Sequence, residues 1–436
     1  MTHNIPSSTT STPPACRRAF FALLAAALLS LSATAAALFP QTTPAAPKPD
    51  DILPPWSEGF LDIHYINTGR GESALFILPD GTTLLVDAGV TYRTPENLTP
   101  LVPGAERTPG EWIARYIDRA LQSAPKKVLN YVLLSHFHGD HYGSVNKSTK
   151  QSSVGDYKAS GLTEVADFIP FEKFIDRAWP DYTGAGDLAQ SRDSLSLKNY
   201  RQFLTWRQKH TGMKIERFKV AANDQIVLLN NPSKYPQFEI RNIAATGVVW
   251  TGNGAATRDI FKGIAPEKIS ENKCSIAFRL SYGPFKFFSG GDISAGDAEA
   301  LPDETWRDIE TPVAQATGPV HVAKANHHAF HDANSISLLR ILRPRVIVVP
   351  TWHIRHLSLN IWSRMKNKNI YPGPRDIFAT TITKTTARFL SDNMEPVSGH
   401  IVIRVHPGGK EYHVYRLTDS DESGRIKSVH GPYKAN

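Results

Sequence analysis

A short cluster of histidine and aspartate residues, placed directly after an apolar stretch, constrains the fold of this chain more than any other feature. Residues 131–134 read Tyr-Val-Leu-Leu and predict a buried strand. The polar residues that follow it are His136, His138, Asp140 and His141. The composition of the chain would produce this spacing by chance in about one chain in a thousand. The cluster is therefore a strong signal.

The spacing of the cluster suits metal ions. Residues two apart in an extended segment project the same way, so His136 and His138 can bind one ion. After the turn at Gly139, Asp140 and His141 can face a second ion. Two ions about 3.5–4 Å apart form the clamp with which many hydrolases attack phosphoryl or acyl centres.

The cysteine content leaves histidine and carboxylate as the metal ligands. Cys16 and Cys274 are the only cysteines among 436 residues, too few for a disulfide framework, a zinc ribbon or an iron–sulfur site. Imidazole and carboxylate favour zinc, with manganese and iron as competitors. We therefore expect one or two divalent ions, and a buried thiol at Cys274.

Three other predicted strands end in polar residues that such a site would need. One is followed by Gly-Gly-Asp292, whose carboxylate could bridge two ions. Another is followed by His327 and His328, which place imidazole at the same edge. Asp87 follows a third strand and is a candidate to orient a ligand histidine.

The chain divides into four parts along its length. These are a signal peptide at 1–37, a proline-rich linker at 38–56, one domain at 57–417 and a polar tail at 418–436. Segment 150–235 is rich in Lys, Arg, Asp and Trp, and we interpret it as a largely helical insertion with helices at 161–175 and 193–210.

Short apolar runs bounded by Gly, Asp and Asn predict the remaining elements. Strands are expected at 61–66, 73–78, 83–86, 131–134, 237–243, 274–282, 285–288, 319–324 and 345–349, helices at 109–122 and 334–342, and a closing hairpin at 399–417. The alternation predicts a sheet covered by helices.

The N-terminus predicts export to the periplasm or the medium. Arg17 and Arg18 precede an apolar run at 19–31 and a small-residue cleavage site at 32–37. The arginine pair resembles a twin-arginine signal, although Sec signals also carry basic residues. No later stretch approaches 18 apolar residues, so we expect no stable membrane insertion after cleavage.

The motifs together resemble the metallo-β-lactamase superfamily, and its branch similar to the hydrolase domain of competence DNA-uptake proteins. The matching motifs are His64 to Ser73, Asp87-Ala-Gly89, His136 to His141, Gly290-Gly-Asp292 and Lys324 to His328. The resemblance implies an α/β (α+β) fold, a four-layer αββα sandwich with metal ions at one edge.

The resemblance also implies site residues. The metal ligands would be His136, His138, Asp140, His141, Asp292 and one of His327 or His328. We favour His327 as the ligand, and expect His328 or Lys324 to assist the leaving group beside the catalytic Asp140. His353 and His356, after a later strand, are candidates for the substrate cleft.

One position departs from the pattern of many superfamily members. They carry a further histidine between the cluster and the bridging aspartate, but here the expected place reads Ala-Ala-Thr-Gly at 244–247. The only histidine in that interval, His210, falls in a predicted helix. Three alternatives therefore remain for the first metal site: it lacks a ligand, it binds its ion weakly, or it is empty. The competence-type branch shares this trait, so catalysis is not excluded.

Three functions remain open from the sequence. The first is an exported hydrolase that uses metal-activated water on phosphate esters or phosphodiesters, with a small or polymeric anionic substrate, nucleic acid included. The formal charge of +8, which falls to +6 without the two arginines of 1–37, is a modest hint in that direction. The second is an acyl hydrolase acting on a β-lactam or lactone. The third is a non-catalytic metal-binding module on the same fold.

Overall fold

The computed structural model describes residues 47–92, 95–190, 194–296, 302–390 and 397–436. The predicted signal peptide at 1–37, and residues 38–46 of the predicted linker, lie outside these residues. Across the described ranges, no helix combines the length and the apolar character that a bilayer crossing requires.

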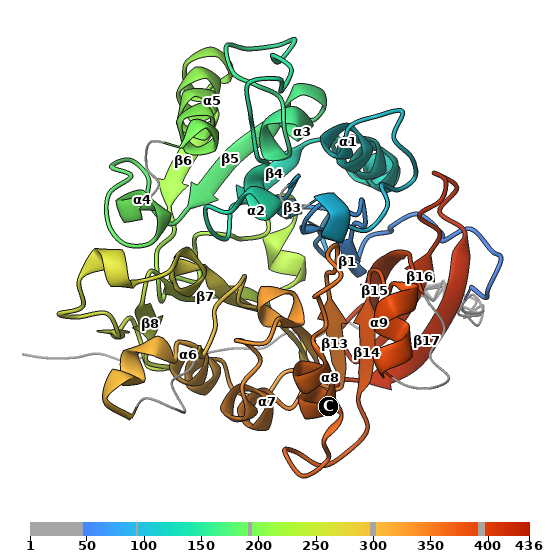
Figure 1. Cartoon of the computed structure of the whole chain (residues 1–436). Coiled ribbons are helices and arrows are strands. Elements are labelled where there is room, and N and C mark those ends of the chain that lie inside the picture. The colour runs from blue at the N-terminus through green and yellow to red at the C-terminus, as the bar shows by residue number, and fades with distance from the viewer. Residues whose placement is uncertain (1–46, 93–94, 191–193, 297–301, 391–396) are drawn as a thin grey trace, which may run out of the picture. The chain divides into compact units, whose positions relative to one another are not determined.

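Two β-sheets form the centre of the described chain (Figure 1). The first has the order β17-β16-β15-β1-β2-β3-β4-β5-β6. Its strands are β1 (Leu61–Tyr65), β2 (Ser73–Ile77), β3 (Thr83–Ala88), β4 (Leu129–Leu133), β5 (Phe171–Asp176), β6 (Lys214–Arg217), β15 (His400–Val405), β16 (Glu411–Leu417) and β17 (Ile426–Lys434). Strands β3 to β6 run parallel, and the others pair antiparallel.

The second sheet has the order β14-β13-β12-β11-β10-β7-β8-β9. Its strands are β7 (Phe238–Ala245), β8 (Val248–Trp250), β9 (Thr257–Asp259), β10 (Ala277–Tyr282), β11 (Phe285–Ser289), β12 (Val322–Lys324), β13 (Val346–Val349) and β14 (Asp376–Ala379). Strands β11 to β14 run parallel, so both sheets mix a parallel part with an antiparallel part.

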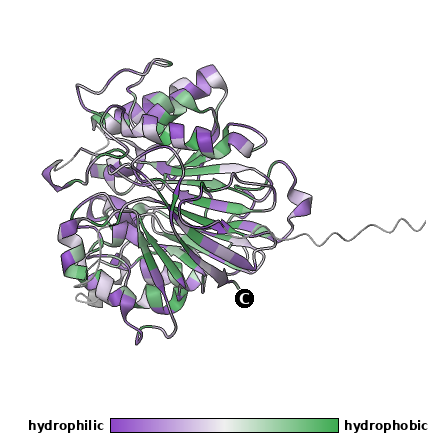
Figure 2. Cartoon of the chain, turned by 90° about the vertical axis from the view of Figure 1, so that its right-hand side faces the viewer, coloured by the Kyte–Doolittle hydropathy of each residue, from purple (hydrophilic) through white to green (hydrophobic). Residues whose placement is uncertain are grey.

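Apolar residues on both faces of the strands explain the layers. In β2, Phe76 packs between the sheets against Phe278 and Phe287, at ring-centroid distances of 6.1 and 5.5 Å. The alternate residues Leu75 and Ile77 point the other way, into a second core under the helices. A strand that is apolar on both faces must be covered on both, which gives a helix–sheet–sheet–helix arrangement. The expected αββα sandwich is confirmed (Figure 2).

Helices cover the outer face of each sheet. They are α1 (Pro109–Ala120), α2 (Gly139–Tyr142), α3 (Leu162–Phe168), α4 (Asp187–Gln190), α5 (Leu195–Thr211), α6 (Glu310–Thr317), α7 (Ile336–Leu342), α8 (Leu359–Lys366) and α9 (Lys384–Leu390). Helix α1 begins at an N-cap, Thr108, whose side chain accepts the Glu111 N–H. Its buried residues recur at helical spacing and pack on the first sheet.

Segment 150–235 is not a helical insertion. The helix expected at 161–175 ends at Phe168, and Phe171–Asp176 form β5 instead. Pro170 gives the physical reason, because a proline disfavours the helical conformation of the residue before it. Strands β5 and β6 extend the first sheet in parallel from β4, so this segment is part of the sandwich (Figure 1).

Residues 418–436 are not a free polar tail. They form β17, which pairs antiparallel with β16 and closes the edge of the first sheet. The end of the predicted linker also joins this edge, since Ile52 bridges to Arg425 and the Asp50 N–H donates to the Ile426 carbonyl. The domain therefore reaches beyond the boundaries of 57–417.

Candidate metal centre

Four strand ends from the two sheets meet at one edge of the sandwich and bring the predicted polar residues together. Asp87 ends β3, the His136–His141 loop follows β4, Asp292 follows β11 and His328 follows β12. Strands β3 and β4 are parallel neighbours, as are β11 and β12. Their carboxyl ends therefore lie at the same edge, and the short loops beyond them converge.

One half of the cluster consists of Asp140, His141, Asp292 and His328, and we call it the Asp140 half. The Asp292 Oδ2 atom lies 3.2 Å from His141 Nε2 and 3.2 Å from His328 Nε2. The Asp140 Oδ2 atom lies 3.3 Å from His328 Nε2 and 3.8 Å from His141 Nε2. The side chains of His141, His328 and Asp292 are buried, and Asp140 is partly open.

The other half consists of His136 and His138 with the same Asp292 carboxylate, and we call it the His136 half. His136 Nε2 lies 3.1 Å from His138 Nδ1 and 3.9 Å from Asp292 Oδ2. After β7 the described chain turns at 246–247 into β8, and no histidine comes from this turn. His210 lies on α5 and stacks on Trp206 at 4.4 Å. The His136 half therefore has fewer ligands than the Asp140 half.

The structure exchanges the expected roles of the neighbouring histidines. His328 faces the cluster, whereas His327 points away, with Nδ1 2.6 Å from Asp332 Oδ1 and Nε2 3.1 Å from Asn272 Nδ2. Both residues lie in a tight turn at 326–329 with positive φ, 45° for His327 and 52° for His328. The expectation that His327 enters the cluster was therefore wrong, because adjacent residues of this turn point to different places.

Asp87 and Ser135 fix the orientation of His141. The Asp87 Oδ2 atom lies 2.8 Å from His141 Nδ1, and Asp87 Oδ1 accepts the Ser135 N–H at 2.8 Å. With Nδ1 held by the carboxylate, Nε2 of His141 is turned toward Asp292. His328 has a similar support, because its Nδ1 lies 3.1 Å from the Pro350 carbonyl.

Lys324 lies beneath the cluster and not beside a substrate. Its Nζ atom is 2.8 Å from Glu72 Oε2 and 3.2 Å from Asp292 Oδ1, and it donates to the Gly291 carbonyl at 2.7 Å. The side chain is fully buried. The expected role of Lys324 in leaving-group departure therefore has no geometric support, and it holds Asp292 in place instead.

Glu72 belongs to the centre, although the sequence analysis gave it no role there. Glu72, His141, Asp292 and His328 each offer a ligand atom within 4.8 Å of the others. Two glycines bring its loop close, since a Cβ on Gly71 or on Gly89 would stand 2.6 or 1.6 Å from the Asp140 carbonyl oxygen. The Gly-x-Gly-Glu spacing was the signal that could have placed Glu72 at the site.

A second pair that the sequence analysis missed, Glu271 and Arg177, supports the His136 half. The Glu271 carboxylate accepts the Phe137 N–H at 2.7 Å and the Arg177 Nε–H at 3.0 Å, and both side chains are buried. The Arg177 guanidinium also lies 4.7 Å from the centre of the Phe137 ring. Because Phe137 stands between His136 and His138, this pair fixes the backbone that presents both imidazoles.

The two halves differ in protonation. Burial opposes the charged form of His141, but Asp292 and Asp87 outweigh it and raise the pKa of His141 well above its usual range. The same balance, with Asp292 as the main partner, raises the pKa of His328 to about 9. Burial, reinforced by the charge of His141, lowers the pKa of His136 well below its usual range. Without metal, the Asp140 half therefore holds protons and His136 stays neutral.

Two further histidines extend the site toward the surface. The ring of His356 stacks on His328 with centroids 4.6 Å apart, and His353 lies 5.4 Å from His356. His356 is buried, so it supports His328 from behind, while His353 is partly exposed. Of these two candidates for the cleft, His353 has the more exposed side chain.

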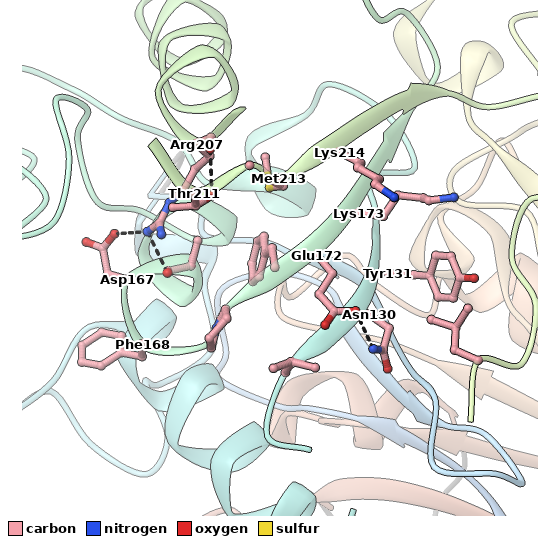
Figure 3. Close-up of a pocket in the computed structure, with 16 residues that line it drawn as sticks. Asn130, Tyr131, Asp167, Phe168, Glu172, Lys173, Arg207, Thr211, Met213 and Lys214 are labelled. Atoms are coloured by element: carbon pink, nitrogen blue, oxygen red, sulfur yellow. Dashed lines mark hydrogen bonds and ion pairs between the residues drawn. The ribbon is translucent and has the colours of Figure 1, made fainter. Parts of the chain in front are cut away.

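A cavity lies at the opposite ends of strands β4, β5 and β6. It has a volume of about 710 Å³ and is lined by residues of β4, β5, β6 and α5 (Figure 3). Several of its polar groups pair with one another, because Arg207 Nη2 lies 2.9 Å from Asp167 and the Asn130 amide donates to Glu172 at 2.8 Å. No residue of the metal centre lines it.

The donor set fits a divalent ion. Nε2 of His328 is buried and has no hydrogen-bond partner of acceptable geometry, although two carboxylates stand close to it. A buried nitrogen of this kind needs a partner, and a metal ion between imidazoles and carboxylates supplies one. The arrangement therefore suits zinc or another divalent ion that accepts nitrogen and oxygen ligands.

Comparison with known protein families gives a match over part of the chain. Residues 67–172, which run from the Glu72 loop through the His136–His141 loop, match the model of the Metallo-beta-lactamase superfamily. No curated protein matches the chain.

Solved structures offer remote likenesses. A protein named as a metal-dependent hydrolase from Parabacteroides distasonis is 12% identical, with 73% of this chain and 92% of that chain covered and a TM-score of 0.32. Human tRNase Z, short form, is 10% identical, with coverage of 66% and 91% and a TM-score of 0.28. The long form RNase Z from yeast is 11% identical, with coverage of 74% and 41% and a TM-score of 0.32.

The matched segment contains two strand ends of the cluster, those of β3 and β4, and the second sheet supplies Asp292 and His328 from outside it. The chain therefore combines a match to the Metallo-beta-lactamase superfamily model over residues 67–172 with a buried His/Asp/Glu cluster at the edge of two mixed sheets.

Proposed function

We propose that this protein is a metal-dependent hydrolase of phosphate esters or phosphodiesters. The observation that carries the proposal is the position of Asp292 Oδ2, which lies 3.2 Å from His141 Nε2, 3.2 Å from His328 Nε2 and 3.9 Å from His136 Nε2. A single carboxylate oxygen that faces both halves is what a pair of neighbouring ions requires.

The residues of the chain have distinct tasks in this proposal. Asp140, His141, Asp292 and His328 would hold one ion, and His136, His138 and Asp292 a second. Bound ions would activate water and stabilise negative charge on the substrate oxygens. Asp87 keeps the Nε2 atom of His141 toward the ion, and Lys324 keeps Asp292 ionised, since burial is outweighed by His328, His141 and Lys324 in lowering the Asp292 pKa.

An anionic substrate is supported by the charge of the chain and by a partly exposed imidazole near the cluster. The formal charge is +8, and +6 without the two arginines of 1–37. His353 is partly exposed, and its imidazole can donate a hydrogen bond to a phosphate oxygen. Oligonucleotides are included among the proposed substrates.

The substrate class is tested with the purified full chain loaded with zinc or manganese. We expect turnover of bis-p-nitrophenyl phosphate or single-stranded DNA that Asp140→Ala abolishes. Asp118→Ala is the matched control, because Asp118 lies on α1, its side chain is about half exposed and it pairs with Lys127 at 2.8 Å. Turnover of nitrocefin alone would make the protein an acyl hydrolase. A folded protein that binds metal and turns over none of the three would be a binding module.

We also propose that the chain belongs with the competence-type branch and acts outside the cytoplasm. The absence of a histidine after β7 in the described chain, and the packing of the Gly71-Glu72 loop against Asp140, support the branch. The basic and apolar pattern of 1–37 supports export. N-terminal sequencing of the protein from the periplasm or the medium should begin after 35–37. A full-length chain found only in the cytoplasm would contradict export.

A further inference from the structure

A second group of metal-ligand side chains lies at the far end of the first sheet. His406 and Glu411 flank the turn between β15 and β16, and His413 is two residues further along β16. Val405 pairs with Leu61 at the start of β1, whereas the Glu72 loop follows the other end of β1. The hairpin and the metal centre are therefore at opposite ends of β1.

The three side chains share one face of the hairpin. The His406 N–H donates to the Glu411 carbonyl at 2.9 Å, so these residues stand opposite each other across the hairpin. Opposite residues of an antiparallel pair project to the same face, and so do residues two apart on one strand. Glu411 and His413 are two apart on β16, so all three side chains lie together.

The spacing of the ligand atoms matches that around a small metal ion. His406 Nε2 lies 3.1 Å from His413 Nδ1, and the ligand atoms of the three residues are all within 4.8 Å of one another. Two nitrogens on a tetrahedral zinc ion, each about 2.0–2.1 Å from the metal, stand about 3.3–3.4 Å apart. Bringing an ion between them requires only small movements of the side chains.

The hairpin is held in shape before any ion binds. The Gly408 N–H donates to the Tyr282 hydroxyl at 3.1 Å, and a Cβ on Gly409 would stand 1.8 Å from the Tyr282 carbonyl oxygen. The tip of the hairpin is thus fixed against the second sheet. The His406 ring packs on Phe60 at 5.3 Å and the His413 ring stacks near Tyr415 at 6.0 Å, which restricts both imidazoles.

We propose that His406, Glu411 and His413 form a second metal site, separate from the catalytic centre, for a zinc-class divalent ion. Two imidazoles and one carboxylate are ligands that zinc prefers, and a water molecule would complete four-coordination. Glu411 also pairs with Lys434, but the Lys434 side chain is 63% exposed and can turn into solvent when an ion takes its place. Without an ion, the two imidazoles share one hydrogen bond.

The role of this site is structural. Glu411 is opposite Lys434 of β17, and Arg404, opposite His413, forms a buried ion pair with Asp62 of β1. An ion here would tie together the hairpin that pairs with β1 on one side and β17 on the other. It would stabilise the sheet without touching the hydrolytic centre.

The test counts zinc ions per chain. The metal-stripped full chain is titrated with zinc alone, and bound zinc is measured for the wild type, His406→Ala, Glu411→Gln and His210→Ala. We expect His406→Ala to bind one ion fewer and Glu411→Gln to bind this ion more weakly. His210→Ala is the matched control because His210 is an exposed histidine that stacks on Trp206, and it should bind as the wild type does.

A second measurement separates this site from the catalytic centre. In the background of Asp292→Asn, which removes the carboxylate shared by both halves of the catalytic centre, cobalt(II) bound at the hairpin should give visible absorption bands, and adding His406→Ala should remove them. His406→Ala should lower the metal affinity of the hairpin by more than the roughly 10–100-fold that is typical when a residue that only contacts a metal ligand is replaced. Phosphodiester hydrolysis by His406→Ala should match the wild type. Unchanged zinc count, affinity and cobalt spectrum in folded His406→Ala would overturn the proposal.

Discussion

The two halves of the metal centre share Asp292 but are built differently. The Asp140 half has two imidazoles and two carboxylates, and both imidazoles have a raised pKa. The His136 half has two imidazoles and a more distant share of Asp292, and the pKa of His136 is lowered. One half is rich in ligands but occupied by protons, while the other is neutral but short of a ligand. The number of ligands favours metal binding in the Asp140 half, whereas competition from protons favours it in the His136 half.

The largest effect is expected from Asp292→Asn, which breaks both halves at once. The amide keeps the shape of the side chain but removes the shared anionic oxygen. We expect zinc affinity to fall more than about 100-fold in each half, beyond the range for groups that only orient a ligand. Lys324 keeps its contact with Glu72, so the fold should persist. Retention of two tightly bound ions per chain would show that Asp292 does not bridge the halves.

A paired exchange at the neighbouring histidines tests which of them enters the Asp140 half. We expect His328→Gln to remove the zinc ion of that half and the hydrolytic activity with it. His327→Gln should change zinc affinity less than about threefold, since its ring contacts Asp332 and Asn272 instead. Isothermal titration of both variants with zinc measures the difference. Equal losses in the two variants would contradict the placement of His328.

The supports of the two halves should be separable. Asp87→Asn weakens the hold on His141, and Glu271→Gln weakens the hold on the backbone between His136 and His138. We expect each change to lower zinc affinity by about 10–100-fold in its own half and to leave the other half near the wild-type value. Glu271→Gln also leaves Arg177 without its carboxylate, so urea unfolding should show a loss of about 3–5 kcal/mol. A loss in both halves from either change would mean that they are one rigid unit.

The zinc affinity of the two halves should depend on pH differently, with slopes that differ by about tenfold in affinity per pH unit. The His328 pKa of about 9 lies above its usual 6.5, so this proton stabilises the metal-free protein below pH 6.5, and that contribution disappears as the pH rises through 9. Zinc must displace the proton, so zinc affinity of the Asp140 half should rise at least about tenfold per unit from pH 6.5 to 8.5. The His136 half should show no such slope in that range. Zinc titrations at three pH values, in which the protons released on binding are also measured, check this contrast.

The sequence predicts most strands of the sandwich because their signal is local. Segments such as 73–78 and 131–134 are apolar on both faces and end in Gly, Asp or His. Strand β5 was not predicted because its apolar residues follow those of α3 without a polar break, and only Pro170 marks the boundary. Strand β17 was not predicted because few of its side chains are buried. Its pairing with β16 is also not a property of the local sequence.

The site shows the same limit. His136, His138, Asp140 and His141 are recognisable because four ligands fall within six residues. The choice between His327 and His328 depends on positive φ angles in a turn, which composition does not reveal. Glu271 and Arg177 lie 94 residues apart, and their role becomes visible only when the fold places them behind Phe137. The loop after β4 and the orienting Asp87 could therefore be predicted from the sequence, whereas the choice of His328 and the Glu271–Arg177 support could not.

The buried position of Lys324 bears on how the protein folds before it binds a metal ion. Its ammonium group already neutralises part of the charge of Glu72 and Asp292 at the junction of the two sheets. The carboxylates therefore need no external counter-ion for the sheets to come together, unlike those of small domains that remain unfolded without zinc. Maturation can then proceed in two stages, with the polypeptide complete first and the metals acquired afterwards, wherever in the cell or beyond it they are supplied.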